Sequence, residues 1–126
     1  MERPLDLDRS DEIAIAYVKL YSSEEGTSEY EECFWAFDAL EELTRLAPAL
    51  FVDQIDRILV LAAGDDLLGY LGAGPLEDFL ALHGDTHGHQ VFAKIRQDVN
   101  WRRMARTVWR STISDSVWQE LQRLCN

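Results

Sequence analysis

Two apolar stripes of helical period, one on either side of Pro48, constrain this chain more than any other feature. In each stripe, apolar residues recur at steps of three and four, and charged residues fall between them. The stripes consist of Cys33, Ala36, Phe37, Leu40, Leu43 and Ala47 before the proline, and of Phe51, Val52, Ile55, Ile58, Leu59 and Ala62 after it. Because neither helix can bury its apolar face alone, we expect the two to fold back on each other as a helical hairpin.

Residues that start and stop helices divide the rest of the first half. Ser10 is a suitable N-cap for a first helix, and Gly26 marks the turn that follows it. Ser28 and Glu31 have the spacing of a capping box, so the next helix is expected to begin at Ser28 and to continue without a break to the proline. Gly64 is expected to end the hairpin in the left-handed conformation that glycine adopts most readily.

The second half of the chain carries similar signals. Gly74 and Pro75 predict a turn, with the proline in the first turn of a short helix that Gly84 ends. Further helices are expected over residues 86–99 and 101–110, and a second capping box at Ser116 and Gln119 predicts a terminal helix. The sequence contains no period-two alternation longer than a few residues, so the pattern predicts no sheet.

The length of 126 residues suits one domain with one continuous core. We therefore predict a single all-helical domain over residues 1–126, a compact bundle of about six to eight helices, with residues 1–9 as an extended lead-in. A shift of 37 residues places Leu43 on Leu80 and Ile58 on Ile95. This period is close to that of helical-hairpin repeats, so the bundle is expected to consist either of HEAT-like stacked hairpins or of plainly orthogonal helices.

Charge is divided unevenly along the chain. Residues 1–85 hold 20 Asp and Glu against 5 Lys and Arg, whereas residues 86–126 hold 3 against 7, and the net charge is -11. An acidic body of this kind repels nucleic acid and anionic membranes and attracts basic surfaces. The predicted partner is therefore a basic protein, and neither nucleic acid nor a membrane is expected to bind. The alternative is that the acidic excess only maintains solubility.

Ten acidic residues of the first half, in the predicted turn around Gly26 and on the helices that follow it, are the candidates for binding such a partner. They are Glu24, Glu25, Glu29, Glu31, Glu32, Asp38, Glu41, Glu42, Asp53 and Asp56. Electrostatic attraction by this surface would speed association and make it depend on salt. The first functional hypothesis is a non-catalytic domain that occludes a basic surface of another protein, as an immunity protein against a bacterial toxin or a nucleic-acid-mimicking inhibitor does.

The three histidines supply a second hypothesis. His83, His87 and His89 lie within seven residues of one another, beside Asp85, and as metal ligands they would support a metal-dependent enzyme. On a helix that begins after Gly84, however, His87 and His89 point about 200° apart and do not readily share a metal ion. The favoured interpretation is a polar connection between two helices. A scaffold or assembly module is the third hypothesis.

Other residue patterns in the sequence favour structure over chemistry. Glu41 and Glu42, like other adjacent carboxylates, point in different directions on a helix and cannot flank one substrate atom. We expect two free thiols, at Cys33 on an apolar stripe and at Cys125 near the C-terminus; a disulfide between them is the alternative. We predict no catalytic residue and no cofactor.

A cluster of arginines and tryptophans occurs in the second half of the chain. Its members are Trp101, Arg102, Arg103, Arg106, Trp109 and Arg110. Arginines and aromatic rings together suit contacts with phosphates and bases. Because the whole chain is acidic, the favoured interpretation is that these arginines neutralise acidic residues of the same domain.

The sequence contains no segment of the kind that anchors or exports a protein. The N-terminus lacks an apolar run after a basic segment, and no window approaches the roughly 18 to 20 apolar residues that span a bilayer. We therefore expect a cytoplasmic protein.

Three short motifs resemble those of a known family. They are Trp35-Ala36-Phe37-Asp38-Ala39-Leu40-Glu41-Glu42-Leu43, Ala73-Gly74-Pro75-Leu76-Glu77-Asp78 and His83-Gly84. In this order and spacing they resemble a family of small, all-helical bacterial proteins known only as a domain of unknown function, over residues 34–110. The resemblance implies a compact helical domain from a bacterium and attaches no activity to it.

Overall fold

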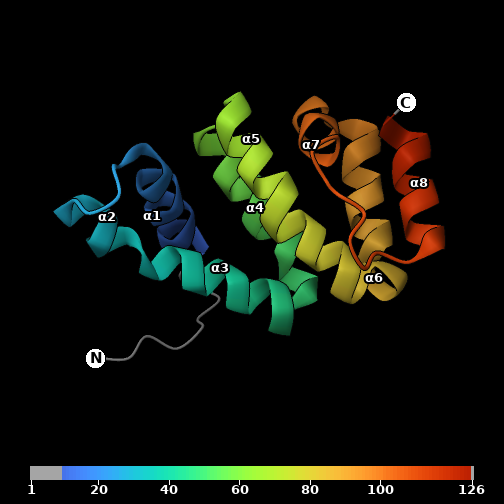
Figure 1. Cartoon of the computed structure of the whole chain (residues 1–126), viewed down its shortest axis with the longest axis horizontal. Helices are drawn as coiled ribbons and strands as arrows, with labels where there is room; N and C mark the ends of the chain where they lie inside the picture. The colour runs from blue at the N-terminus through green and yellow to red at the C-terminus, as the bar shows by residue number, and fades with distance from the viewer. Residues whose placement is uncertain (1–9, 126) are drawn as a thin grey trace. The chain divides into compact units, whose positions relative to one another are not determined.

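The computed structural model describes residues 10–125, so the predicted lead-in at residues 1–9 lies outside the described residues. Within 10–125 the regular elements are helices and no strand occurs, which confirms the all-α class. The chain forms two compact units, unit 1 up to residue 62 and unit 2 from residue 63 onward, and Figure 1 shows the helices of each. A single continuous core and HEAT-like stacking stay predictions.

Unit 1 contains, in its described part, α1 (Ser10–Ser22), α2 (Ser28–Cys33), α3 (Trp35–Leu46), a 3-10 turn (Pro48–Leu50) and α4 (Phe51–Leu61). The two predicted stripes lie on α3 and α4, where Leu40, Phe51 and Ile55 are fully buried. Both helices pack more extensively against α1 than against each other. The predicted hairpin therefore buries its stripes largely against a third helix.

The first helix can take this central place because it is apolar around much of its circumference. Ile13, Ala14, Tyr17 and Leu20 are buried, so α1 offers apolar side chains to both α3 and α4. The turn that ends the helix is where the sequence predicts it, with Gly26 in the left-handed region at φ 89°.

α2 begins at Ser28, as predicted, but its N-cap is a different residue. Thr27, rather than Ser28, is the N-cap, and its hydroxyl accepts a hydrogen bond from the Tyr30 N–H at 3.2 Å. The capping box predicted for Ser28 and Glu31 is therefore wrong. A threonine cap satisfies the same unpaired backbone donors, so either hydroxyl residue suits this position chemically.

The helix predicted to run unbroken from Ser28 to Pro48 is interrupted at Phe34. The Phe34 N–H donates to the Glu31 carbonyl at 3.4 Å, and the Phe37 N–H donates to the Phe34 carbonyl at 2.9 Å. Hydrogen bonds across three residues tighten the backbone relative to an α-helix. They separate α2 from α3 without taking Phe34 out of the right-handed region.

Unit 2 contains α5 (Asp65–Leu71), a π-helical turn (Gly72–Leu76), α6 (Glu77–Gln97), α7 (Val99–Ala105) and α8 (Asp115–Cys125). The long α6 is the scaffold of the unit, because α7 and α8 both pack against it. In Figure 1 α5 continues through the π-helical turn into α6, and the later part of α6 runs back beside α7 and α8. The core of unit 2 includes the buried side chains of Phe79, Leu80, Ile95 and Trp101.

The turn predicted at Gly74-Pro75 is wrong, because the helix continues through it. Proline lacks an N–H donor and its ring collides with the carbonyl four residues earlier in an α-helix. A π-helical turn around Pro75 widens the backbone there, so the chain passes into α6 without a break.

The helix end predicted at Gly84 is also wrong, since this glycine is buried inside α6. A Cβ built on Gly84 would lie 3.0 Å from both γ-methyl groups of Val117. The residue thus allows α8 to approach α6 closely, and packing overrides the weak helix propensity of glycine. Gly64, predicted as a left-handed C-cap, has an extended backbone instead and precedes α5 as its N-cap residue.

Gly72 lies at a still closer approach of two backbones. A Cβ at this position would lie 1.8 Å from the Thr107 Oγ1 and 2.2 Å from the Met104 carbonyl oxygen. No side chain fits there unless the backbone of the α7 segment moves. Gly72 therefore fixes how closely the π-helical turn meets the end of α7.

The last two helices begin at different residues from those that the sequence predicts. Asp98 caps α7, as its carboxylate accepts hydrogen bonds from the N–H groups of Asn100 and Trp101. The C-terminal helix starts at Asp115, so Ser116, predicted as its cap, already lies inside its first turn.

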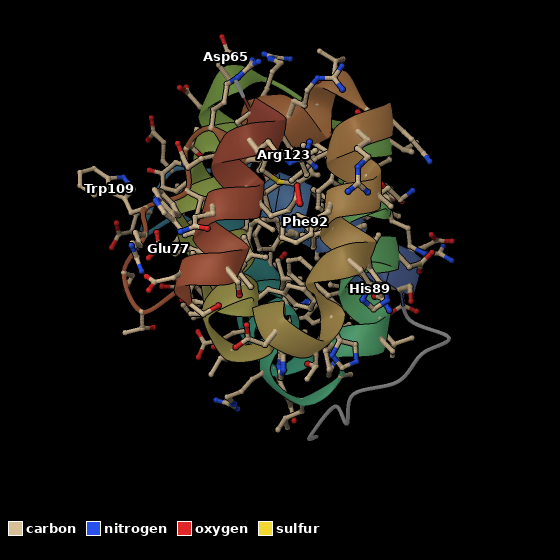
Figure 2. The ribbon with its side chains drawn as sticks, turned by 90° about the vertical axis from the view of Figure 1, so that its right-hand side faces the viewer. Asp65, Glu77, His89, Phe92, Trp109 and Arg123 are labelled. Carbon is tan, nitrogen blue, oxygen red and sulfur yellow. The ribbon has the colours of Figure 1, made fainter. Side chains whose placement is uncertain are left out.

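The helix predicted over residues 101–110 ends early, and residues 106–114 form a loop held by side chains. The Glu77 carboxylate accepts a hydrogen bond from the Trp109 N–H at 3.0 Å, and the Ser114 hydroxyl bonds to Asp85 at 2.8 Å. In Figure 2 the Trp109 side chain projects away from the ribbon. Its 75% exposure agrees with this view.

Candidate protein-binding surface

Most of the predicted partner-binding carboxylates reach solvent. Nine of the ten are exposed and Asp56 is half-buried. Eight of them lie on the turn before α2, on α2 itself and on α3, and we call this set the acidic face: Glu24, Glu25, Glu29, Glu31, Glu32, Asp38, Glu41 and Glu42. None of the eight takes part in an ion pair described within residues 10–125.

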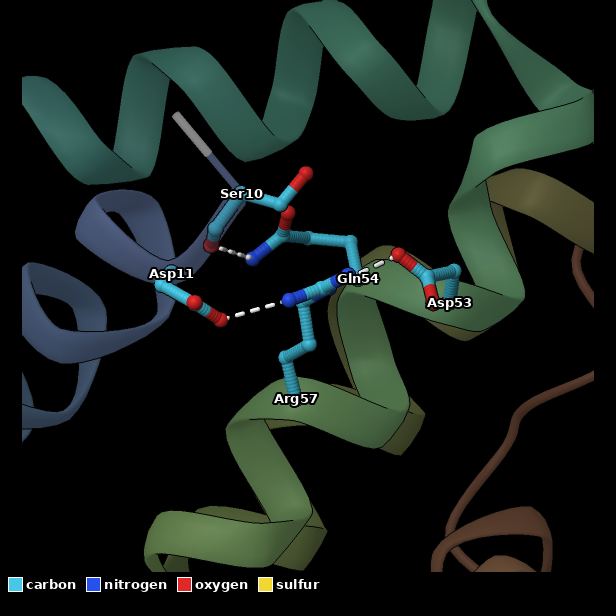
Figure 3. A network of polar contacts seen from close by, with 5 residues as sticks. All are labelled: Ser10, Asp11, Asp53, Gln54 and Arg57. Atoms are coloured by element: carbon cyan, nitrogen blue, oxygen red, sulfur yellow. Dashed lines mark hydrogen bonds and ion pairs between the residues drawn. The ribbon is translucent and has the colours of Figure 1, made fainter. Parts of the chain in front are cut away.

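The remaining two candidates belong to α4 and differ from the acidic face. Asp53 accepts a hydrogen bond from the Arg57 Nε at 2.8 Å, and the same guanidinium reaches Asp11 of α1 at 2.6 Å (Figure 3). These hydrogen bonds, the one to Asp53 first, raise the pKa of Arg57. Gln54 donates to the Ser10 carbonyl at 2.9 Å in the same network. Asp53 therefore holds Arg57 within α4, and it is Arg57 and Gln54 that join α4 to α1.

Three aromatic rings form a continuous row beside the acidic face, which the sequence analysis did not identify. The ring centroids of Tyr30 and Phe34 are 5.9 Å apart, and those of Phe34 and Phe37 are 5.5 Å apart in a stacked arrangement. Phe34 and Phe37 are each 40% exposed. We call Tyr30, Phe34 and Phe37 the aromatic row. An exposed apolar row is more informative than a single exposed apolar residue, because contiguous patches mark interaction surfaces.

Helix geometry explains why the row and the carboxylates lie together. On α3 the buried residues Ala36, Leu40 and Leu43 form one side of the helix. Phe37 and Glu41 are four residues apart, so both project from a side that is turned away from the core. Asp38 projects from that side as well, and all three are exposed. Phe37 belongs to the predicted apolar stripe but is exposed, and its position at the edge of that stripe is the sequence signal that it lies outside the core.

The described structure does not gather the histidines into a metal site. Because α6 is continuous, His83 and His87 are four residues apart and their ring centroids lie 6.0 Å from each other. His87 Nδ1 is 2.8 Å from the Thr86 hydroxyl, and His89 points away from the helix in Figure 2. No group of three or more His, Cys, Asp or Glu side chains within 10–125 is placed to hold a metal ion. Asp85 bonds to Ser114 instead.

The arginines of unit 2 are used within that unit. Arg102 donates to the carbonyl oxygens of Ile95 and Arg96, while Arg106 donates to the Cys125 carbonyl. Arg103 pairs with Asp65, and Arg110 with Asp115. Of the four, only Arg103 contacts a carboxylate of residues 1–85 within the described chain. The other contacts hold together the ends of helices in the second half.

Both cysteines are free thiols, as expected, and neither is placed as a nucleophile. Cys33 is buried and Cys125 is half-buried. Burial raises the pKa of Cys125, while the nearby Arg106 acts in the opposite direction. A thiol with a raised pKa holds little thiolate at neutral pH.

The chain belongs to the Family of unknown function (DUF6869), which it matches over residues 23–126. Neither a curated protein nor a solved structure gives a significant match. Among the helices of residues 10–125, none combines the length and the apolar character needed to cross a membrane.

Proposed function

We propose that this chain is a non-catalytic acidic domain that binds a partner protein and occludes a basic surface of it. The observation that carries the proposal is the acidic face, with eight exposed carboxylates next to the aromatic row. Carboxylates attract the partner over a distance, and partly exposed aromatic rings supply contact area once it has arrived.

The distribution of charge favours unit 1 as the binding unit. Residues 1–62 hold 15 Asp and Glu against 5 Lys and Arg, whereas residues 63–126 hold 8 against 7. Clustered charge of one sign produces a field that steers a basic partner and speeds its association. The nearly neutral second unit has no comparable field.

The class of partner follows from the same chemistry. Proteins with large basic surfaces are commonly those that bind nucleic acid, and an acidic surface can take the place of the nucleic acid. Within this proposal the domain acts in the bacterial cytoplasm, as an immunity protein against a toxin or as an inhibitor that imitates nucleic-acid charge.

The test uses the full chain as bait beside two variants of equal net charge. Asp38→Asn with Glu41→Gln removes two carboxylates of the acidic face, and Asp66→Asn with Glu120→Gln removes two exposed or half-exposed ones from unit 2. Proteins that bind the wild-type and control baits but not the first variant are identified by mass spectrometry and purified for kinetic measurement.

We expect such a partner to be basic, to bind with an association rate that falls about tenfold or more between low and high salt, and to lose access to its own ligand when bound. A partner that binds all three baits equally, or whose association rate is indifferent to salt, would contradict the proposal.

A further inference from the structure

The aromatic row and the nearest carboxylates together have the chemistry of a receptor for one kind of cation. Phe34 and Phe37 are each 40% exposed and their rings stack on each other, while Asp38 and Glu41 project from the exposed side of α3. Because Phe37 and Glu41 are four residues apart on that helix, a cation bound between them would meet an aromatic ring and a carboxylate at once.

We propose that this site receives arginine side chains of the partner in preference to lysine side chains. The inference rests on the proposed function, since it specifies how the basic partner is recognised. A guanidinium is planar and weakly hydrated, so it can stack on a ring while its N–H groups bond to a carboxylate in a forked geometry. A lysine ammonium is a compact, strongly hydrated charge that gains less from the ring.

Two features of the chain argue against other occupants of this face. The phosphates of a nucleic acid would be repelled by the eight carboxylates of the acidic face. A second copy of this chain would itself carry a net charge of -11 and be repelled as a whole, and its Arg102, Arg103 and Arg110 already bond to carbonyl or carboxylate oxygens of unit 2. The occupant that fits is an arginine-rich segment of another protein.

The experiment uses two fluorescent synthetic peptides of equal length and charge, one with arginine and one with lysine at every basic position. Fluorescence anisotropy measures their affinity for the full wild-type chain, and we expect the arginine peptide to bind about fivefold more tightly. The variant Phe34→Leu with Phe37→Leu should lose this preference and keep its affinity for the lysine peptide. Leu46→Ala, which truncates an exposed apolar residue on another side of α3, is the matched control and should behave as the wild type.

The outcomes separate this inference from the proposed function. Equal affinity for the two peptides, or a preference that survives in the double leucine variant with an unchanged circular dichroism spectrum, would overturn the arginine receptor and leave an acidic binding face intact. Failure of both peptides to bind at low salt would overturn the proposed function as well.

Discussion

The two units of this chain use charged side chains in opposite ways. In unit 1 the acidic residues outnumber the basic ones by three to one, and eight carboxylates of the acidic face point to solvent. In unit 2 the two signs nearly balance, and the arginines bond to helix-end carbonyls and to neighbouring carboxylates. Charged residues that make contacts within the unit are explained by the fold. The carboxylates of the acidic face make no such contacts within residues 10–125, so their role is either to bind a partner or to maintain solubility.

The units also differ in how their helices meet. Unit 1 buries α1 between two amphipathic helices, with bulky side chains such as Tyr17 and Phe51 at the contacts. Unit 2 relies on glycines that bring backbones together, at Gly72 beside Met104 and at Gly84 beside Val117. Small changes of volume should therefore affect unit 2 more severely.

The largest expected effect comes from adding one methyl group at the closest backbone approach in unit 2. Gly72→Ala would place a Cβ 2.2 Å from the Met104 carbonyl oxygen, so we expect it to lower the free energy of unfolding by about 3 kcal/mol or to prevent folding of that unit. Gly74→Ala, where the added Cβ meets open space, is the control and should be neutral or slightly stabilising. Urea titrations of both variants measure the difference, and equal midpoints would contradict the close-approach argument.

A second large effect should appear in unit 1 at alkaline pH. Burial, followed by the neighbouring Tyr21, raises the pKa of Tyr17 above its usual value of 10.0. Above that pH the unfolded chain releases the Tyr17 proton while the folded chain keeps it, so stability contributed by this residue falls by about 1.4 kcal/mol per pH unit.

Tyr17→Phe should remove this part of the alkaline loss. Urea titrations of the wild type and the variant between pH 8 and pH 11 check this prediction. The quantity to compare is the slope of the free energy of unfolding against pH, not its absolute value. If the wild type and Tyr17→Phe lost stability with the same slope, the buried tyrosine would not be the cause.

The two helix caps give a matched comparison between the units. The Thr27 hydroxyl accepts one N–H at the start of α2, whereas Asp98 accepts two at the start of α7 and carries a negative charge toward the helix dipole. Thr27→Ala and Asp98→Ala should each cost about 1 kcal/mol, with Asp98 the larger. Thermal melts rank the two, and a larger loss at Thr27 would reverse our ranking of the caps.

The smallest effect concerns the exposed arginines of unit 2. Reversing the charge in the Arg103→Glu, Arg106→Glu double variant breaks the contacts to Asp65 and to the Cys125 carbonyl, and such exposed contacts contribute roughly 0.2 to 1 kcal/mol each. We expect a modestly lower melting temperature whose difference from the wild type shrinks at high salt. An unchanged melt, together with binding of short RNA or DNA by the wild type alone, would instead identify these arginines as a nucleic-acid site.

The sequence predicted the helical class and most of the core because these depend on local periodicity. Leu40, Ile55 and Ile58 repeat at helical spacing and are all buried. The helix ends predicted at Gly74 and Gly84 were wrong for a different reason. Whether a glycine ends a helix or lets another helix pack closely against it depends on residues far along the chain, such as Val117 beside Gly84. Local pattern carries no information about that neighbour.

The candidate surface was predicted in part for a similar reason. Exposed carboxylates follow from charge and helical phase, so the acidic face could be read from the sequence. The aromatic row required knowing that the chain tightens at Phe34, which brings the ring of Phe34 to 5.5 Å from that of Phe37. Asp53 was chosen by its charge, and its partner Arg57 lies four residues later on the same helix, a spacing that the sequence shows. The contact of Arg57 with Asp11 depends on how α1 lies against α4 and could not be predicted in this way.

The central claim is that unit 1, through its acidic face and aromatic row, binds cationic protein segments and that unit 2 does not. The most direct measurement is a titration of the isotope-labelled full chain with the arginine peptide, followed by backbone amide chemical shifts. We predict that the shifts concentrate in residues 24–42, saturate, and disappear at high salt. Shifts that concentrate in residues 86–125, or that spread evenly over both units, would contradict the claim.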